Sequence, residues 1–353
     1  MTDKDILRTC LSNVDGEAGS LVILGQPLAE VVSRYTYPTL AQALWGVYAP
    51  SQSPVVEADF CRAQDTAWQL LQPMAMTLAK QETAISALRL GLEYATAQTP
   101  TEITMTLMVS LLLHIKPTAS LSPEGTATGR FFKALSDDEP GAVHISERAR
   151  ALEHYLMTVS DHGFNASTYT ARVIASTGSD LKSCVQGALG ALAGPLHGGA
   201  PGPVLDMLDA VEAAASPEIW VRDALARGER IMGFGHRIYR VRDPRADVLK
   251  QVLKQLKASG VQPERLARAE QLEAVVLQAL KAHKPQRALE TNVEYYTALL
   301  LDALGFSRAH FTAIFALGRV LGWCAHAMEQ QALGRLIRPA GTYIEPQDLL
   351  ISC

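Results

Sequence analysis

Apolar residues recur three and four positions apart along most of the chain, which is the spacing of one face of an α-helix. The pattern is clearest in residues 152–159, 246–256, 266–280 and 311–328. Strand-like pieces are short, as in residues 21–24. The hydrophobic pattern therefore predicts a mainly α fold.

Turn signals separate the predicted helices. Gly-rich or Pro-containing turns occur at residues 122–125 and 198–202, and Asp243 stands directly before Pro244. An aspartate at that place predicts a helix N-cap followed by proline at the first helical position. The chain contains no internal repeat, low-complexity tract or Pro/Ser-rich linker. Any second domain is therefore expected to be inserted into the first, without a tether.

Small residues crowd residues 187–194, which include Gly187, Gly190 and Gly194. A glycine inside a helix costs roughly 1 kcal/mol relative to alanine, so repeated glycines favour close packing against another helix, in the core or at a subunit interface. This segment leads into His197, which stands on a turn bounded by glycines.

Composition and charge exclude several classes of protein. The 353 residues carry a net charge of −4, which argues against a nucleic-acid partner. The five cysteines lie far apart with no C-x-x-C pair, so we expect reduced thiols in a cytoplasmic protein and no disulfide framework. The N-terminus lacks a signal-peptide pattern, and the longest apolar run, residues 103–115, is too short to span a membrane.

An arginine-rich stretch, residues 232–245, is the first candidate for chemistry. It surrounds His236 with four arginines in sequence: Arg237, Arg240, Arg242 and Arg245. Guanidinium groups bind carboxylates and phosphates, and an imidazole can polarise a carbonyl, so the stretch suits a multiply anionic small molecule. On its charge pattern alone, a solvated basic loop is an equal alternative.

Several segments, taken in order, resemble the citrate synthase family. They are residues 160–168, 194–199, 233–245, 292–296, 315–319 and 335–339, and residues 13–19 more loosely resemble the family's opening hairpin. Each segment alone is a weak signal, but their shared order over most of the chain is specific. The resemblance implies an enzyme that condenses an acyl-CoA with a 2-oxo acid, usually oxaloacetate, and then hydrolyses the thioester.

The resemblance also implies a role for each site residue. Glu294 would take a proton from the thioester methyl, His197 would hold the thioester oxygen, and His236 would polarise the ketone. The substrate carboxylates would be held by His162, Arg245, Arg319 and Arg338. Arg338 would come from the neighbouring subunit of a homodimer, and Arg240 would lie near the CoA phosphates. Acetyl-CoA or propionyl-CoA is then a co-substrate, with no tightly bound cofactor.

Structural roles are the alternative for each of these residues. The remaining histidines are expected to be structural, with His326 a hydrogen-bonded core or interface group. Arg319 lies in an apolar helical stretch and would be costly to bury without an anionic partner, which could be a structural carboxylate. A zinc site is the weakest alternative, because the three site histidines lie in separate segments without ligand spacing.

Two departures from the family pattern bear on function. Glu294 stands where the family usually has aspartate, and Leu24 stands where a basic residue is common. Three functions stay open: citrate synthase using acetyl-CoA, 2-methylcitrate synthase using propionyl-CoA, and a family member of low or no activity. The resemblance implies a large helical domain from residues 1–199 and 306–353. A smaller helical domain, residues 200–305, would close over the cleft.

Overall fold

The computed structural model describes residues 8–49, 56–136, 144–198, 202–214, 216–236, 238–286 and 289–345. Most of these residues are helical, which confirms the mainly α prediction. In chain order the helices are α1 (Leu28–Arg34), α2 (Tyr37–Gly46), α3 (Glu57–Leu71), α4 (Ala75–Ala79), α5 (Ala84–Tyr94), α6 (Pro100–Ile115), α7 (Ala127–Ser136), α8 (Ile145–Thr158), α9 (Ala166–Ala175), α10 (Leu181–Leu192), α11 (Gly202–Glu212), α12 (Pro217–Ala226), α13 (Pro244–Ala258), α14 (Pro263–His283), α15 (Val293–Ala303) and α16 (Phe311–Leu333), with 3₁₀ turns η1 (Gln72–Met74) and η2 (Arg308–His310).

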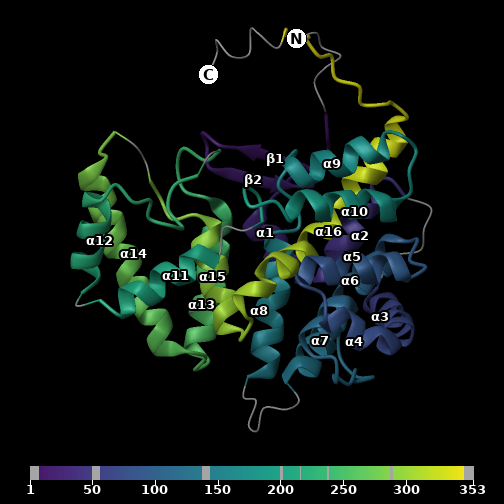
Figure 1. Cartoon of the computed structure of the whole chain (residues 1–353), viewed down its shortest axis with the longest axis horizontal. Coiled ribbons are helices and arrows are strands. Elements are labelled where there is room, and N and C mark those ends of the chain that lie inside the picture. Colours follow the sequence, from purple (N-terminus) through teal and green to yellow (C-terminus); the bar gives the residue numbers. More distant parts are fainter. Residues whose placement is uncertain are drawn as a thin grey trace.

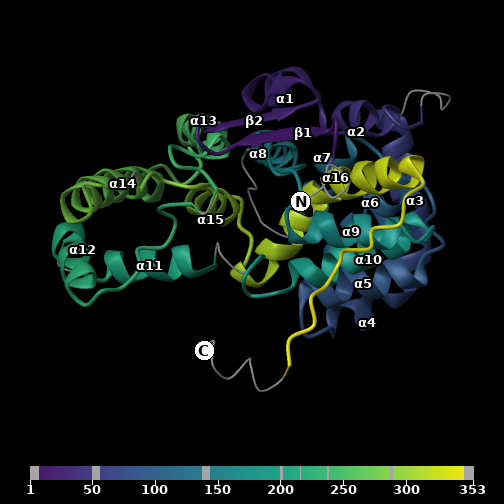
Figure 2. The same ribbon diagram turned by 90° about the horizontal axis from the view of Figure 1, so that it is seen from above.

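The helices form two neighbouring groups (Figures 1 and 2). We call α1–α10 and α16 the body, and α11–α15 the arm. Helices α11, α12 and α14 lie farthest from the body in both views, and α13 joins the groups by packing against α8 and α1. The domain boundary near residue 200 falls outside the described residues, so the domain division stays a prediction.

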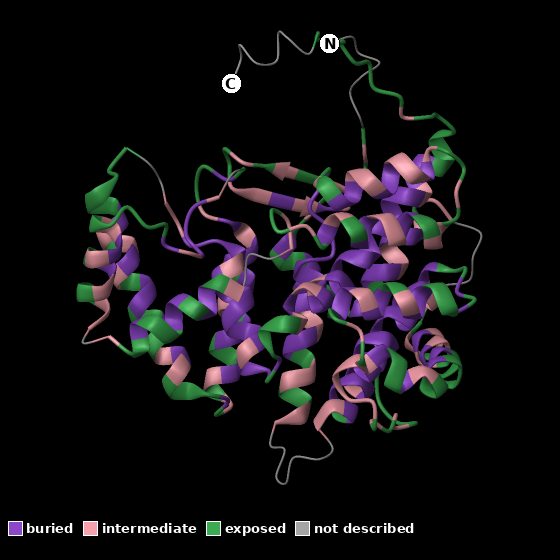
Figure 3. Ribbon diagram, in the orientation of Figure 1, coloured by how far each residue is buried: buried purple, intermediate pink, exposed green. Residues whose placement is uncertain are grey.

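Helix α16 passes through the middle of the body and is buried on nearly every side (Figure 3). Together with η2 it is long and apolar enough to cross a membrane, but 83% of its apolar window is buried by the rest of the chain. Such burial is typical of a central core helix. Two glycines let other backbone approach it closely, because a Cβ on Gly322 would lie 2.4 Å from Ser160 O and one on Gly318 2.6 Å from Leu156 O.

Local signals in the sequence account for the helix boundaries. Asp243 caps α13 by accepting a hydrogen bond from the Arg245 N–H at 3.1 Å, with Pro244 at the first helical position, as predicted. Close packing at Gly187 is also confirmed, since a Cβ there would lie 2.1 Å from Ile174 Cδ1 on α9. Gly190, in contrast, faces open space.

The described strands form one small antiparallel sheet, ordered β1 (Ser12–Asp15), β2 (Ser20–Ile23) and β3 (Gln26–Pro27). Ser12 pairs with Ile23 and Asp15 with Ser20. The hairpin between β1 and β2 meets the arginine-rich stretch, because Gly16 O accepts a hydrogen bond from the Arg240 N–H at 2.8 Å. The hairpin therefore fixes one side of the loop that carries His236.

Candidate active site

Side chains from the body and the arm line one cavity of about 460 Å³. Its walls include His162, His197, His236, Arg245, Glu294 and Arg319. Three of these come from the body and three from the arm. It gathers imidazole, carboxylate and guanidinium groups from five separate segments, and we call it the catalytic cavity after the role proposed for it below.

His236 lies on a loop whose backbone is fixed by Gly233 and Gly235. Both glycines have positive φ (83° and 78°), and a Cβ on Gly233 would lie 2.9 Å from Tyr295 Cβ. The imidazole Nδ1 accepts hydrogen bonds from the backbone N–H groups of Ile238 (3.0 Å) and Tyr239 (3.1 Å). The neutral ring therefore carries its proton on Nε2.

The protonation state of His236 suits a hydrogen-bond donor to a carbonyl. Burial and the nearby Arg245 guanidinium lower the pKa of His236 to about 4, so the ring is neutral at physiological pH. Its Nε2 lies 3.3 Å from an Arg245 nitrogen. Since both nitrogens carry hydrogen, neither accepts from the other, and an oxygen atom lying in front of both would accept from each.

Glu294 lies in the first turn of α15 and is linked to the His236 loop through Asn292. The Asn292 Oδ1 caps the helix by accepting from the Glu294 N–H at 3.0 Å. The amide group of Asn292 donates to Gly235 O at 2.8 Å and to Glu294 Oε2 at 3.4 Å. Burial raises the pKa of Glu294, although Arg245 and Arg230 oppose it. A raised pKa makes the carboxylate a stronger base.

His197 follows α10 and is positioned by the buried hydroxyl of Ser167. Its Nε2 lies 2.8 Å from Ser167 Oγ, which also accepts from the Trp323 indole N–H at 3.1 Å. Burial and the Arg319 charge lower the pKa of His197 to about 4. Ser167 Oγ also donates to Asn165 Oδ1 at 2.8 Å, and its one hydrogen cannot serve both partners. Only when that hydrogen turns to His197 Nε2 does the neutral ring carry its proton on Nδ1 and donate it elsewhere.

Two buried arginines give the catalytic cavity its anion-binding character. Arg319 is 1% exposed, donates from Nε to Val159 O at 2.7 Å, and forms no ion pair with another described residue. Burial and the charge of Arg245 lower the pKa of Arg319 to about 10, so it stays cationic at neutral pH. Arg245 pairs with Asp243 at 2.8 Å. A buried cation without a counter-ion is costly unless a ligand supplies one.

His162 lies between these arginines and the His236 loop. Its Nε2 is 3.0 Å from the Tyr239 hydroxyl, and its ring is edge-to-face with that of His236 at a centroid distance of 6.2 Å. Burial, followed by Arg245, Arg319 and His236, lowers the pKa of His162. The ring is therefore neutral and can donate a hydrogen bond to a carboxylate.

The remaining predicted residues either do not line the catalytic cavity or lie outside the described residues. Arg240 is exposed and approaches Glu17 at 3.8 Å, and Arg242 pairs with Asp247. The four arginines therefore do not form one cluster at His236: Arg245 alone among the described ones contacts it. Arg237 lies outside the described residues. Arg338 is exposed beyond the end of α16.

Three residues of the site were given no role by the sequence: Ser167, Tyr239 and Asn292. Asn292 carried a usable signal, because an asparagine directly before an apolar periodic segment predicts an N-cap. Ser167 and Tyr239 had no such signal, since their partners, His197 and His162, lie 30 and 77 positions away.

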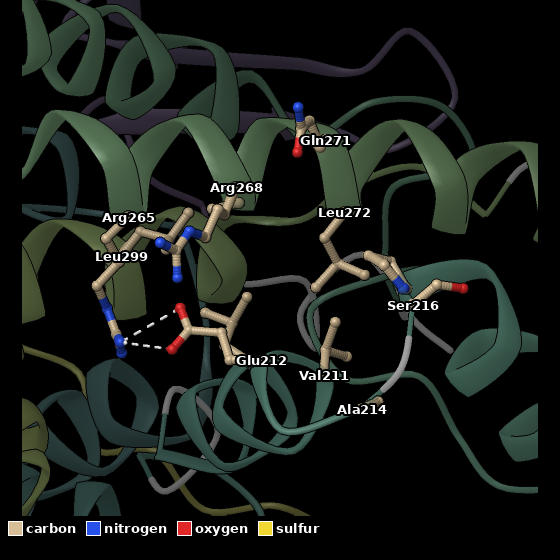
Figure 4. Close-up of a pocket in the computed structure, with 12 residues that line it drawn as sticks. Val211, Glu212, Ala214, Ser216, Arg265, Arg268, Gln271, Leu272 and Leu299 are labelled. Carbon is tan, nitrogen blue, oxygen red and sulfur yellow. Dashed lines mark hydrogen bonds and ion pairs between the residues drawn. The ribbon is translucent and has the colours of Figure 1, made fainter.

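A second cavity, of about 250 Å³, lies within the arm between α11, α12, α14 and α15 (Figure 4). Its lining is mostly apolar and includes Leu272 and Leu299, with Glu212, Arg265 and Arg268 at its edge. Arg265 reaches Glu212 at 3.3 Å, as Figure 4 shows, and Asp302 at 2.7 Å. The lining contains no histidine and no base placed beside a nucleophile, so its residues do not form a recognisable catalytic group.

Metal binding has no support in the described part of the chain. None of its histidines, cysteines, aspartates and glutamates form a group of three placed to hold a metal ion.

Comparisons with known proteins agree on one family. The family model described as "Citrate synthase, C-terminal domain" matches residues 1–340. A citrate synthase of Deinococcus radiodurans is 31% identical over 96% of this chain and 93% of its own length. A 2-methylcitrate synthase of Mycobacterium tuberculosis is 31% identical over 95% of this chain and 87% of its own. Another Mycobacterium tuberculosis relative is 46% identical over 63% of this chain, and that match spans only 57% of the relative's length.

Solved structures share the architecture. The citrate synthase of Thermotoga maritima superposes with a TM-score of 0.77 at 29% identity, covering 97% of this chain and 94% of that one. A Thermoplasma acidophilum citrate synthase, solved as a ternary complex with carboxymethyl coenzyme A and oxaloacetate, superposes with a TM-score of 0.79 over 98% of this chain and 95% of its own. At 24% identity this second likeness shows the fold alone. The chain belongs to the citrate synthase family, a family of transferase-type synthases.

Proposed function

We propose that the protein condenses acetyl-CoA with oxaloacetate and hydrolyses the resulting thioester to citrate and CoA. The observation that carries this proposal is the set of protonation states around the catalytic cavity. A half-buried carboxylate of raised pKa, two neutral imidazoles and two buried guanidinium groups face the same space. This combination serves enolisation of a thioester next to a bound dicarboxylate.

Glu294 is the proposed base that removes a proton from the thioester methyl group. Glutamate is one methylene longer than the family's usual aspartate, and an error of about 1 Å can cost on the order of a hundredfold in rate. The contact from the Asn292 amide to Glu294 Oε2 draws the carboxylate back toward the start of α15. We infer that this contact compensates for the longer side chain.

His197 is the proposed donor to the enolate oxygen. The neutral ring can donate from Nδ1 only when the Ser167 hydroxyl turns from Asn165 Oδ1 and donates to His197 Nε2. The enol carbon then attacks the ketone carbon of oxaloacetate while His236 Nε2–H donates a hydrogen bond to the ketone oxygen. The resulting alkoxide takes up one proton to become the hydroxyl, which balances the proton that Glu294 removed from the methyl group. Water attacks the thioester carbonyl of the product, and CoA leaves as its thiol.

Arg245, Arg319 and His162 are the proposed ligands of the oxaloacetate carboxylates. Arg319 lacks a carboxylate partner within the described chain, so a dianionic substrate supplies the counter-charge that its burial requires. Arg240, which is exposed beside the hairpin, is proposed to meet the phosphates of the CoA. The similarity to a 2-methylcitrate synthase favours propionyl-CoA as the alternative acyl donor.

Closure of the arm over the body is proposed to exclude water during condensation. The cavity walls support this, because His162, His197 and Arg319 belong to the body while His236, Arg245 and Glu294 belong to the arm. The predicted domains, residues 1–199 with 306–353 and residues 200–305, would then be the two moving parts. A cytoplasmic location also stays a proposal, with support from Cys10, Cys61, Cys184 and Cys324, which are unpaired.

Release of CoA tests the proposal directly. Purified protein is given oxaloacetate with acetyl-CoA or propionyl-CoA, and the free thiol is measured with a chromogenic disulfide. We expect a higher kcat/KM for acetyl-CoA; a clear preference for propionyl-CoA would favour 2-methylcitrate synthase. Glu294→Gln should abolish turnover while oxaloacetate binding, measured by calorimetry, stays within about twofold. Wild-type protein that binds oxaloacetate but releases no CoA would support the low-activity alternative.

We further propose a homodimer in which the partner subunit's Arg338 completes each catalytic cavity. Arg338 is exposed and does not line the cavity of its own chain. Mixing inactive Glu294→Gln with inactive Arg338→Leu should restore up to about a quarter of wild-type activity, because some mixed dimers carry one intact site. Two inactive variants that stay inactive after exchange of subunits, shown by mixed-tag pull-down, would reject the shared site.

A further inference from the structure

A chain of buried polar side chains lies directly beneath the catalytic cavity. It consists of Asp161, His326, Arg172 and Glu329, each at most 3% exposed, and we call it the buried relay. His326 Nε2 lies 3.2 Å from both carboxylate oxygens of Asp161, and His326 Nδ1 lies 3.1 Å from an Arg172 nitrogen. Arg172 also pairs with Glu329. The relay runs from the body's interior to the residue before His162.

The hydrogen bonds of the buried relay have one direction. Arginine can only donate, so His326 Nδ1 accepts from Arg172. The other ring nitrogen, Nε2, then donates its proton to Asp161. His326 is therefore a hydrogen-bonded core group, as the sequence led us to expect, but it also connects two distant charges.

The relay is one of three successive attachments between α16 and the segment that presents His162. Val159 O accepts from Arg319 Nε at 2.7 Å, and Ser160 O accepts from the Gly322 N–H at 3.1 Å. Asp161 makes the third attachment, to His326. These contacts fix Arg319 and His162 relative to one another, because one lies on α16 and the other directly follows the attached segment.

Asp161 also contributes charge to the site. Its interactions with His326, Ser12 and Arg319 outweigh burial and lower its pKa, so it is ionised. Its negative charge in turn raises the pKa of Arg319, which burial and Arg245 lower. Asp161 therefore helps Arg319 to stay cationic, although the two form no ion pair. Phe164, the next aromatic residue along the chain, covers the relay, with its ring 5.7 Å from that of His326.

We propose that Asp161 and His326 are positioning residues for the 2-oxo dicarboxylate substrate, which they do not touch. They fix the positions of His162 and Arg319 relative to one another, and the Asp161 carboxylate favours the charged form of Arg319. This inference rests on the proposed function, in which His162 and Arg319 bind the substrate carboxylates. Supporting residues of this kind matter because small displacements of binding groups are costly.

Replacement of His326 separates a positioning role from a packing role. His326→Leu keeps the volume but removes both hydrogen bonds, and we expect the oxaloacetate Kd and KM to rise tenfold or more with a smaller loss of kcat. His326→Gln can accept from Arg172 and donate to Asp161, so it should recover to within about threefold of wild type. Cys324→Ala, also buried on α16 but outside the relay, is the matched control and should leave oxaloacetate affinity unchanged.

Asp161→Asn tests the effect of the Asp161 charge on Arg319. It also provides a second test if His326→Leu fails to fold. Without the carboxylate, Arg319 should lose its proton at lower pH, so the alkaline loss of oxaloacetate affinity should shift to lower pH. Calorimetry without acyl-CoA measures this over pH 7–10. Either of two results would overturn this inference and leave the proposed function intact. One is a folded His326→Leu with wild-type oxaloacetate affinity; the other is an Asp161→Asn protein that loses oxaloacetate affinity at the same alkaline pH as wild type. Wild-type protein that fails to bind oxaloacetate would overturn the proposed function and this inference with it.

Discussion

The catalytic cavity and the second cavity differ most in how their arginines are buried and paired: Arg319 is 1% exposed, whereas the Arg265 side chain is 29% exposed. In the second cavity, Arg265 has three carboxylate partners: Asp209, Glu212 and Asp302. In the catalytic cavity, Arg319 has no ion-pair partner among the described residues, and Arg245 has only Asp243. Arg265 is fully paired without a ligand, whereas Arg319 has a carboxylate, Asp161, only at longer range. Charge pairing therefore identifies a binding site better than the mere presence of space.

The physical basis of this difference is the cost of moving charge out of water. A buried charge without a partner costs several kcal/mol, and a protein keeps one only where something supplies the missing interaction. Arg319 retains its charge in spite of burial, because its pKa falls only to about 10. A dianionic substrate would relieve that cost on binding, which gives affinity and selectivity for two carboxylates at once.

Replacement of Arg319 in the catalytic cavity and of Arg265 in the second cavity by leucine should give the largest difference between the cavities. Arg319→Leu should lower kcat/KM for oxaloacetate by roughly 100-fold to 1,000-fold, because a charge-assisted interaction with the substrate is lost. Arg265→Leu should lower thermal stability slightly, since three partly exposed carboxylates lose their cation, while kcat/KM stays within about twofold. Steady-state kinetics and thermal unfolding of both variants measure the two effects.

The proposed difference between the two cavities is wrong if Arg319→Leu and Arg265→Leu lower kcat/KM by the same factor. An Arg265→Leu protein that unfolds at a lower temperature but loses oxaloacetate affinity as strongly as Arg319→Leu would show that pairing does not separate the cavities. Arg319→Lys sharpens the result: it keeps the charge but not the planar fork, so it should recover only part of the lost affinity.

Much of the fold could be predicted from the sequence because its signals are local. Helical periodicity located α13, α14 and α16, and Asp243 before Pro244 marked a helix start. The candidate site residues came instead from the order of several short segments that resemble one family, and the structure brings His162, His197, His236, Arg245, Glu294 and Arg319 to one cavity.

The parts that could not be predicted depend on partners distant in sequence. Ser167 contacts His197 across 30 positions, and His326 contacts Asp161 across 165. Neither residue differs in type or spacing from an ordinary core residue. Arg242 shows the opposite error: its place beside His236 in sequence indicated a shared site, but its side chain pairs with Asp247. Side-chain direction, which sequence distance does not fix, decides such cases.

Acidification gives a smaller contrast between the cavities, through stability. His197 and His236 have native pKa values of about 4, whereas an imidazole in the unfolded chain has a pKa of about 6.5. Above pH 6.5 neither state binds protons at these rings. Between pH 6.5 and pH 4 the unfolded chain binds them and the native protein does not, so a falling pH favours unfolding.

Urea unfolding at pH 7 and pH 5 measures this contribution. His236→Gln removes one of the two rings, so the loss of unfolding free energy from pH 7 to pH 5 should shrink by on the order of 1 kcal/mol relative to wild type. Arg265→Leu, in the second cavity, has no such imidazole in its surroundings and should keep the wild-type loss. Equal losses in His236→Gln and wild type would mean that the ring is protonated at the same pH in both states. The neutral donor assigned to His236 would then lose its basis.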